Sequence, residues 1–74
     1  MSIEFTVTLV DSTSHAMRIE KLLKKHGLLC KLIPVPRHLS SDCGVCVRIR
    51  KQDMDMIKAL LKEHHITIQS MEAL

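Results

Sequence analysis

Residues 3–27, IEFTVTLVDSTSHAMRIEKLLKKHG, pass directly from a strand pattern to a helix pattern. Apolar and polar residues alternate in IEFTVTL, which is typical of a β-strand with one face in the core, so we expect a strand over about residues 3–10. The DSTS that follows carries side chains that cap helices, and apolar residues then recur at helical spacing until basic residues and Gly27 end the pattern. We therefore expect a helix over about residues 14–26.

Two further strands are expected on either side of a long loop. Residues 28–33 form a short, mostly apolar run that Pro34 ends, because proline has no backbone N–H to donate to a sheet. Residues 45–50, VCVRIR, alternate again. Their valine and isoleucine side chains are expected to face the core, and the open face of the sheet is expected to carry Cys46, Arg48 and Arg50.

The C-terminal third of the chain predicts a second helix and a last strand. Asp53 can cap a helix with an apolar stripe at helical spacing, which ends at His64 and His65. Isoleucine then alternates with polar residues over 66–69, which predicts a short strand. Residues 70–74 are expected to form a tail.

The order of these elements predicts an α+β fold. We expect the ferredoxin-like βαββαβ arrangement, in which two helices cover one face of an antiparallel four-stranded sheet with strand order 4-1-3-2. Residues 1–74 should form one domain with a core of about residues 3–69, because the chain is too short to divide. In this topology residues 11–15 and 34–44 meet at one edge of the sheet.

The composition indicates a globular protein and excludes several classes. It is 46% hydrophobic and 26% charged with two Gly and two Pro, unlike disordered or collagen-like chains. Every apolar run is far shorter than the ~18–20 residues of a membrane span, and no basic segment leads into an apolar one at the N-terminus, so we expect a cytoplasmic protein with no membrane partner. The net charge of +3 is dispersed and Phe5 is the only aromatic residue, which argues against nucleic-acid binding. Because so small a core gains little stability alone, a homodimer is compatible with the sequence.

The loop between the second and third strands carries the most reactive residues. It is longer than a hairpin needs, and long loops in compact domains are often functional. Cys43 is followed by Gly44, which can adopt a positive φ and lets another group approach the main chain. Only the thiolate is a good nucleophile, so a reactive Cys43 requires neighbours that lower its thiol pKa. We expect such neighbours to surround an exposed Cys43.

Groups that stabilise an anion are available on both sides of this edge. The first turn of the first helix offers unpaired backbone N–H groups and the positive end of the helix dipole. His15 lies in that turn, whereas Arg37 and His38 lie in the loop itself. The residues expected to support an anion at Cys43 are Ser14, His15, Arg37, Ser40, Ser41 and Gly44.

Cys43 and Cys46 match the spacing CxxC, which has two common uses. A structural zinc site needs four ligands, and although His15 or His38 could contribute, no complete set has the standard spacing. A thioredoxin-like pair opens a helix, whereas this pair enters a strand, so no resting disulfide is expected. We therefore expect no metal and no cofactor, with Cys46 as a resolving thiol that releases a group held on Cys43. Cys30 is expected to be a core residue.

Three segments occur in an order that is characteristic of one protein family: STSHAM and EKLLKKHG in the first helix, then KLIPVPRHLSSDCGVCVR across the loop. They bring Ser12, Thr13, His15, Pro34, Val35, Pro36, Arg37, Ser40, Ser41, Cys43, Gly44 and Arg48 into register with its motif. On these residues the chain, over about residues 3–68, resembles the small bacterial proteins called putative selenium/sulfur carrier protein-like. Asp42, whose charge opposes thiolate formation beside it, and Cys46, where an apolar residue is usual, depart from the pattern.

The resemblance implies a ferredoxin-like fold and a carrier that holds selenium or sulfur on Cys43. Such a carrier accepts sulfane sulfur or selenium from a donor such as a cysteine desulfurase, holds it as a persulfide or perselenide, and passes it to an acceptor protein. We expect stoichiometric transfer rather than independent enzymatic turnover, because no carboxylate pair, metal set or phosphate-binding loop is visible. Two alternatives stay open. One is an ACT-like small-molecule regulatory module, and the other is a non-catalytic protein-interaction domain that uses an exposed sheet face bearing Thr6, Thr8, Cys46, Arg48 and Arg50.

Overall fold

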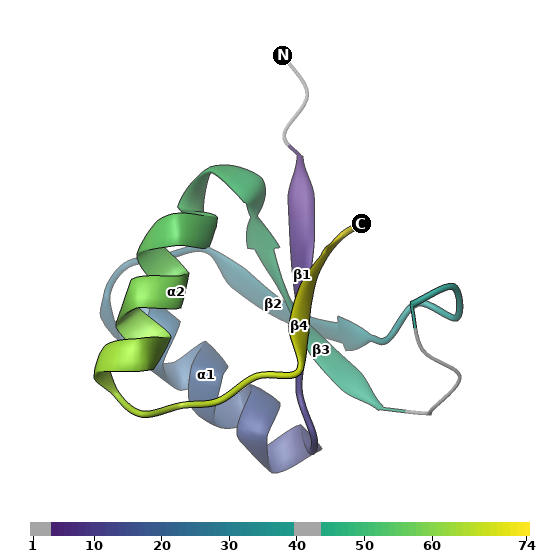
Figure 1. The fold of residues 1–74 in the computed structure, drawn as a ribbon, viewed down its shortest axis with the longest axis horizontal. Helices are drawn as coiled ribbons and strands as arrows, with labels where there is room; N and C mark the ends of the chain where they lie inside the picture. The colour runs from purple at the N-terminus through teal and green to yellow at the C-terminus, as the bar shows by residue number, and fades with distance from the viewer. Residues whose placement is uncertain (1–3, 40–43) are drawn as a thin grey trace.

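The structure, a computed structural model, describes residues 4–39 and 44–74 and has the expected order of elements (Figure 1). One antiparallel sheet has the strand order β2-β3-β1-β4, and this confirms the ferredoxin-like α+β fold. The elements are β1 (Phe5–Leu9), α1 (Thr13–Lys25), β2 (Cys30–Pro34), β3 (Val45–Arg50), a single 3-10 turn (Lys51–Asp53), α2 (Met54–Glu63) and β4 (Ser70–Ala73).

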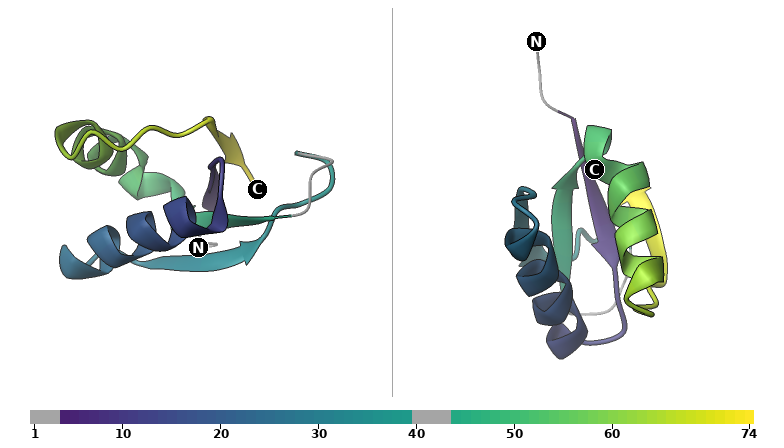
Figure 2. Two further views of the ribbon diagram at one scale, coloured as in Figure 1. Left: turned by 90° about the horizontal axis from the view of Figure 1, so that it is seen from below. Right: turned by 90° about the vertical axis from the view of Figure 1, so that its left-hand side faces the viewer.

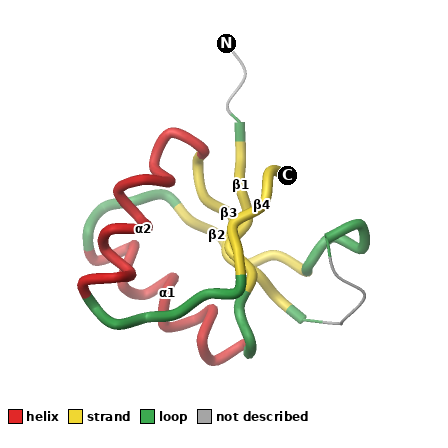
Figure 3. Tube along the Cα trace, in the orientation of Figure 1, coloured by secondary structure: helices red, strands yellow, loops and turns green. Residues whose placement is uncertain are grey.

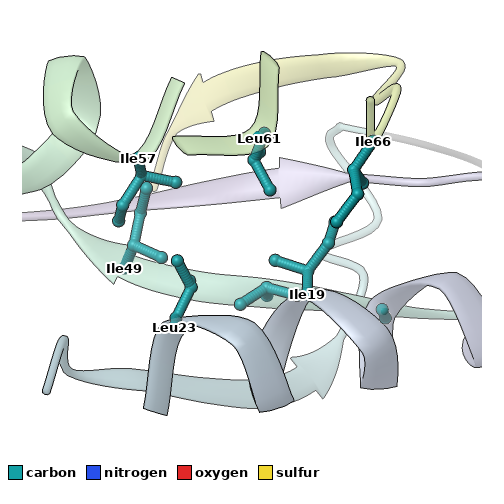
Figure 4. Close-up of a cluster of buried hydrophobic side chains, with 8 residues drawn as sticks. Ile19, Leu23, Ile49, Ile57, Leu61 and Ile66 are labelled. Carbon is teal, nitrogen blue, oxygen red and sulfur yellow. The ribbon is translucent and has the colours of Figure 1, made fainter. Parts of the chain in front are cut away.

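Both helices cover the same face of the sheet, as the two views of Figure 2 show. The core lies between the two layers, where side chains of α1 and α2 meet those of β3 (Figure 4). Ile19, Leu23 and Ile57 are completely buried there, so truncation of any of them to alanine should cost about 2–5 kcal/mol. The buried members of this cluster are Ala16, Ile19, Leu23, Val47, Ile49, Ile57, Leu61 and Ile66.

Strand β1 faces the opposite way from the expectation. Thr6 pairs with Ile49 and Thr8 with Val47, and paired residues of an antiparallel ladder point to the same face. Both threonines therefore point toward the helices, where they are buried, and the Thr6 hydroxyl donates a hydrogen bond to Met54 Sδ at 3.4 Å. The expectation that Thr6 and Thr8 lie on the exposed face of the sheet is therefore wrong, because both are buried on the helix side.

The face of the sheet away from the helices has a small apolar cluster of its own. Val7, Leu9 and Cys46 are buried there, and the side chains packed against them are Ile33, Val35 and Leu39. The first residues after β2 thus fold over the sheet face that the helices leave open. This explains why β1 can bury apolar side chains on one face while its threonines enter the main core.

Local signals place the ends of α1 within a residue of the expectation. The Ser12 hydroxyl accepts a hydrogen bond from His15 N at 3.2 Å and so caps the first turn. At the other end Gly27 has φ +72°, and Leu28 N donates to Leu23 O at 2.9 Å. This pattern of a glycine in the left-handed region with a backward hydrogen bond is the usual way to end a helix.

Asp53 precedes α2 as expected but does not cap it through its side chain. Its carboxylate instead accepts a hydrogen bond from Arg50 Nε at 2.9 Å, and the residue is only 6% exposed. At the C-terminal end, His65 takes a φ of +56° and Ile66 N donates to Leu61 O at 2.8 Å. The helix therefore ends at the expected histidines.

The last strand lies four residues later than expected. Residues 66–69 form the connection from α2 to the sheet, and β4 is Ser70–Ala73, which the sequence predicted to be a tail. Ile66 is buried in the main core, and Gln69 N donates to Leu9 O at 2.8 Å where the chain reaches β1. The isoleucines anchor the connection in the helix layer, so pairing with β1 can begin only after it. Within the described residues, no helix has the length and apolar character needed to cross a membrane.

Candidate functional site

The two described arms of the β2–β3 loop are held by backbone hydrogen bonds. Val35 N donates to Gly44 O at 3.1 Å, which extends the β2–β3 ladder by one step beyond the pairing of Pro34 with Val45. Leu39 N donates to Pro36 O at 3.0 Å and closes a tight turn with Arg37 and His38 exposed at its tip. The loop extends from the sheet on the side away from both helices (Figures 1 and 3). It is therefore anchored at its base and presents its basic residues to solvent.

Three of the expected site residues, Ser40, Ser41 and Cys43, lie outside the described residues. Their neighbour Gly44 is exposed, and a Cβ added to it would meet nothing within 4 Å. Its carbonyl oxygen accepts a hydrogen bond from Val35 N, and a positive φ at Gly44 stays a prediction.

Cys46 is a buried residue of the sheet and not an exposed thiol. It pairs with Ile33 in the β2–β3 ladder and has no exposed surface. Val35 and Leu39 pack against its cluster from the loop side. Burial raises the pKa of the Cys46 thiol above its ordinary value, because a thiolate would lose its hydration there. At neutral pH this thiol is protonated and covered, which opposes a role as the resolving group.

Cys30 is likewise unsuited to act as a nucleophile. It pairs with Ile49, packs against the main core as expected, and its thiol donates to the Glu20 carbonyl at 3.7 Å. Burial raises the pKa of this thiol and the Glu20 carboxylate raises it further, while Lys24 opposes the shift. Both described cysteines therefore favour the neutral thiol.

The first turn of α1 and the described part of the loop lie on opposite faces of the sheet. Ala16, one turn into α1, is in the helix-side core, whereas Val35 and Leu39 pack on the other face. Ser14 is exposed, and His15 is half-buried with an Nε2 atom that has no hydrogen-bond partner among the described residues. No hydrogen bond or ion pair within residues 4–39 and 44–74 joins this turn to the loop. The convergence of α1 with Cys43 stays a prediction.

The two arginines of β3 interact with other side chains near the end of the strand that lies away from the β2–β3 loop. The Arg48 guanidinium lies over the Phe5 ring, 4.2 Å from its centroid, and Arg50 binds Asp53. The stacked pair was missed by sequence reasoning, although a lone aromatic and an arginine on two neighbouring strands were a usable signal. Among the described residues no group of three or more His, Cys, Asp or Glu side chains could hold a metal ion.

Leu39 is a second residue that sequence reasoning missed. It is the only large apolar side chain between Pro36 and Gly44, and it packs against the apolar cluster that contains Cys46. A single leucine within an otherwise polar loop could have indicated an inward-facing anchor.

Comparison with known proteins identifies the family. The family model described as putative Se/S carrier protein-like matches residues 6–71, a span that begins in β1, ends in β4 and contains the whole loop. A search of curated proteins and a search of solved structures each return no match. Since the family model covers almost the entire fold, the chain belongs to the putative Se/S carrier protein-like family.

Proposed function

We propose that this protein carries sulfane sulfur or selenium on Cys43 as a persulfide or perselenide. The observation that carries the proposal is that the other two cysteines are packed into the fold and have raised thiol pKa values. Cys46 has no exposed surface, Cys30 is packed against the core, and the thiol pKa of each is raised. Cys43, next to exposed Gly44 in a loop that extends from the sheet, is the remaining thiol of the three. Membership of the family described as putative Se/S carrier protein-like supports the same choice.

Loading is a transfer of one sulfur atom without net oxidation. The Cys43 thiolate attacks the outer sulfur of a persulfide on the donor, a new S–S bond forms at Cys43, and the donor's S–S bond breaks to release the donor thiolate. A cysteine desulfurase is a donor of the required chemistry. Delivery repeats the step, with a nucleophile of the acceptor attacking the outer sulfur and the Cys43 thiolate leaving. Selenium follows the same path from a donor that holds it in the outer position.

Arg37 is the first candidate to stabilise the outer anion. It is exposed at the tip of the loop turn, and a guanidinium can donate two hydrogen bonds to one anionic group. Ser40 and Ser41 belong to the same loop and would add hydroxyl donors. We rank Ser14 and His15 below them, because the first turn of α1 lies across the sheet from the described part of the loop.

Cys46 is left out of the transfer step. To attack Cys43, the Cys46 thiol would need to leave its buried position and ionise against a raised pKa. Cargo release therefore rests on the nucleophile of the acceptor protein. A reducing compartment such as the cytoplasm suits this chemistry, because Cys43 must stay a free thiol between cycles.

Mass spectrometry after incubation with a cysteine desulfurase and isotopically labelled cysteine tests the proposal. We expect one labelled sulfur on the peptide that contains Cys43, and none in Cys43→Ser. The matched control is Cys46→Val, which fills the same buried site and should still be loaded. Label that persists in Cys43→Ser, or that is absent from the wild-type protein, would contradict the carrier role.

A further inference from the structure

Two adjoining hollows lie beside the C-terminal ends of the helices, and Ile66 lines both. One hollow, of about 220 Å³, lies between α1 and the residues that end α2. The other, of about 470 Å³, lies between α2 and the connection to β4. We call this pair of hollows the cationic groove. Its cationic rim consists of Arg18, Lys21, Lys25, Lys58 and Lys62.

The cationic groove concentrates positive charge without an acidic counterpart. Its rim holds five of the eleven Lys and Arg residues of the chain, although the net charge is only +3. Among the described residues no Asp or Glu lines either hollow. The nearby Glu20 carboxylate lies 3.7 Å from Lys24, which is not part of the rim. Like charges gathered in this way repel one another until an anionic ligand supplies the opposite charge.

The floor of the cationic groove is apolar and recessed. It is formed by Leu22, Leu61, Ile66 and Ile68, of which Leu61 is 2% and Ile66 7% exposed. The large apolar side chains that do protrude from the described surface lie elsewhere, at Met17, Leu29, Met56 and Leu74. A surface that inserts into a membrane needs protruding apolar groups, and the phosphate backbone of a nucleic acid has no apolar groups to fill an apolar floor. Both ligand classes therefore fit the groove poorly.

We propose that the cationic groove binds an acidic amphipathic segment of a partner protein. The apolar side chains of the segment would fill the recessed floor, and its Asp and Glu residues would pair with the rim on both sides. Recognition of a helix through apolar anchors flanked by charge is a common mode of peptide binding. The helices, which supply most of the lining of the groove, and the described arms of the β2–β3 loop lie on opposite sides of the sheet (Figures 1 and 2), so a segment held by the helices lies away from those arms. The inference goes beyond the carrier function and does not depend on Cys43.

The test is an NMR titration of the ¹⁵N-labelled full chain with a synthetic helical peptide that has leucines along one face and glutamates flanking them. We expect the largest amide shifts at Leu22, His64, Ile66 and Thr67. Lys21→Glu/Lys58→Glu should weaken binding about tenfold, because it replaces attraction by repulsion at two ion pairs. The matched control is Lys31→Glu/Lys51→Glu, which makes the same charge change on exposed lysines outside the groove and should alter affinity less than twofold.

Four results would overturn the proposal. The first is the absence of amide shifts in the groove, and the second is an equal loss of affinity in both double variants. The third is undiminished binding of a peptide whose leucines are replaced by serine. The fourth is tighter binding of anionic phospholipid vesicles or of a DNA oligonucleotide than of the peptide at the same residues. Cys43→Ser should bind the peptide as the wild type does. Failure of the carrier proposal and failure of the groove proposal are therefore separate outcomes.

Discussion

We expect Leu39 to limit access to Cys46, so Leu39→Ala should expose that thiol selectively. The leucine is half-buried and packs on the cluster of Cys46, Val7 and Leu9. Truncation of a fully buried leucine costs about 2–5 kcal/mol, so we expect a loss of about 1–2 kcal/mol from a half-buried one. If Cys46 reacts by local opening of the loop segment, this loss raises the open population and the alkylation rate about 5- to 30-fold.

The assay is alkylation by iodoacetamide at neutral pH in a Cys43→Ser background, with the adducts at Cys30 and Cys46 counted separately by peptide mass spectrometry. Cys30 is an internal control, because it packs on the other face of the sheet and should keep its slow rate. Leu29→Ala is the matched variant, since Leu29 is 60% exposed and should leave both rates unchanged.

Two outcomes would refute this reasoning. An unchanged rate at Cys46 in Leu39→Ala would mean that the leucine is not its cover. An equal rise at Cys30 and Cys46 would mean that both thiols react through global unfolding and not through local opening of the loop segment.

Three further predictions concern stability measured by urea unfolding. The thiols of Cys30 and Cys46 have pKa values in the folded protein that are raised above the ordinary 9.0, so their contribution to stability is complete below that pH and is lost as pH rises through the raised values. The drop in stability from pH 8 to pH 10.5 should therefore be smaller in Cys46→Val than in the wild type, and an equal drop would contradict the assignment. Thr8→Val should stabilise the fold by about 1 kcal/mol, because the Thr8 hydroxyl is buried without a hydrogen-bond partner among the described residues. Thr6→Val loses the hydrogen bond to Met54 and should therefore gain less stability. Destabilisation by Thr8→Val would show that the Thr8 hydroxyl has a hydrogen-bond partner. Gly27→Ala should destabilise the fold by about 1 kcal/mol, because Gly27 has φ +72° and an L side chain is strained there; an unchanged urea midpoint would refute the backbone assignment.

Much of the fold was predictable because the signals that specify it are local. The alternation in VCVRIR placed β3 at the bounds the structure shows, and Ser12 and Gly27 marked the ends of α1. The number and order of elements then left the ferredoxin-like sheet as the natural way to bury two helix faces. Of the candidate site, the sequence supplied the identity of the thiols, the basic residues in the loop and the core position of Cys30, but not the burial of Cys46.

Residues 66–69 show where local reasoning stops. Their alternation predicted a strand, yet Ile66 is needed in the helix-side core and the chain must still cross to the sheet before it can pair with β1. Only the distance between the two layers, which no local pattern encodes, moves the strand to Ser70–Ala73.

The type of most elements and the family motif can be read from the chain, since they depend on spacing between near neighbours or on residue identity, and the strand order follows from the order of the elements and the handedness of their connections. The chain alone does not reveal which face of β1 meets the helices, nor whether Cys46 is exposed or buried. A period of two divides a strand into two sets of side chains without saying which set faces inward, and here both sets are buried. That assignment depends on Leu39 and on the helices, which reach the sheet from distant parts of the sequence and exist as a surface only once the molecule has folded.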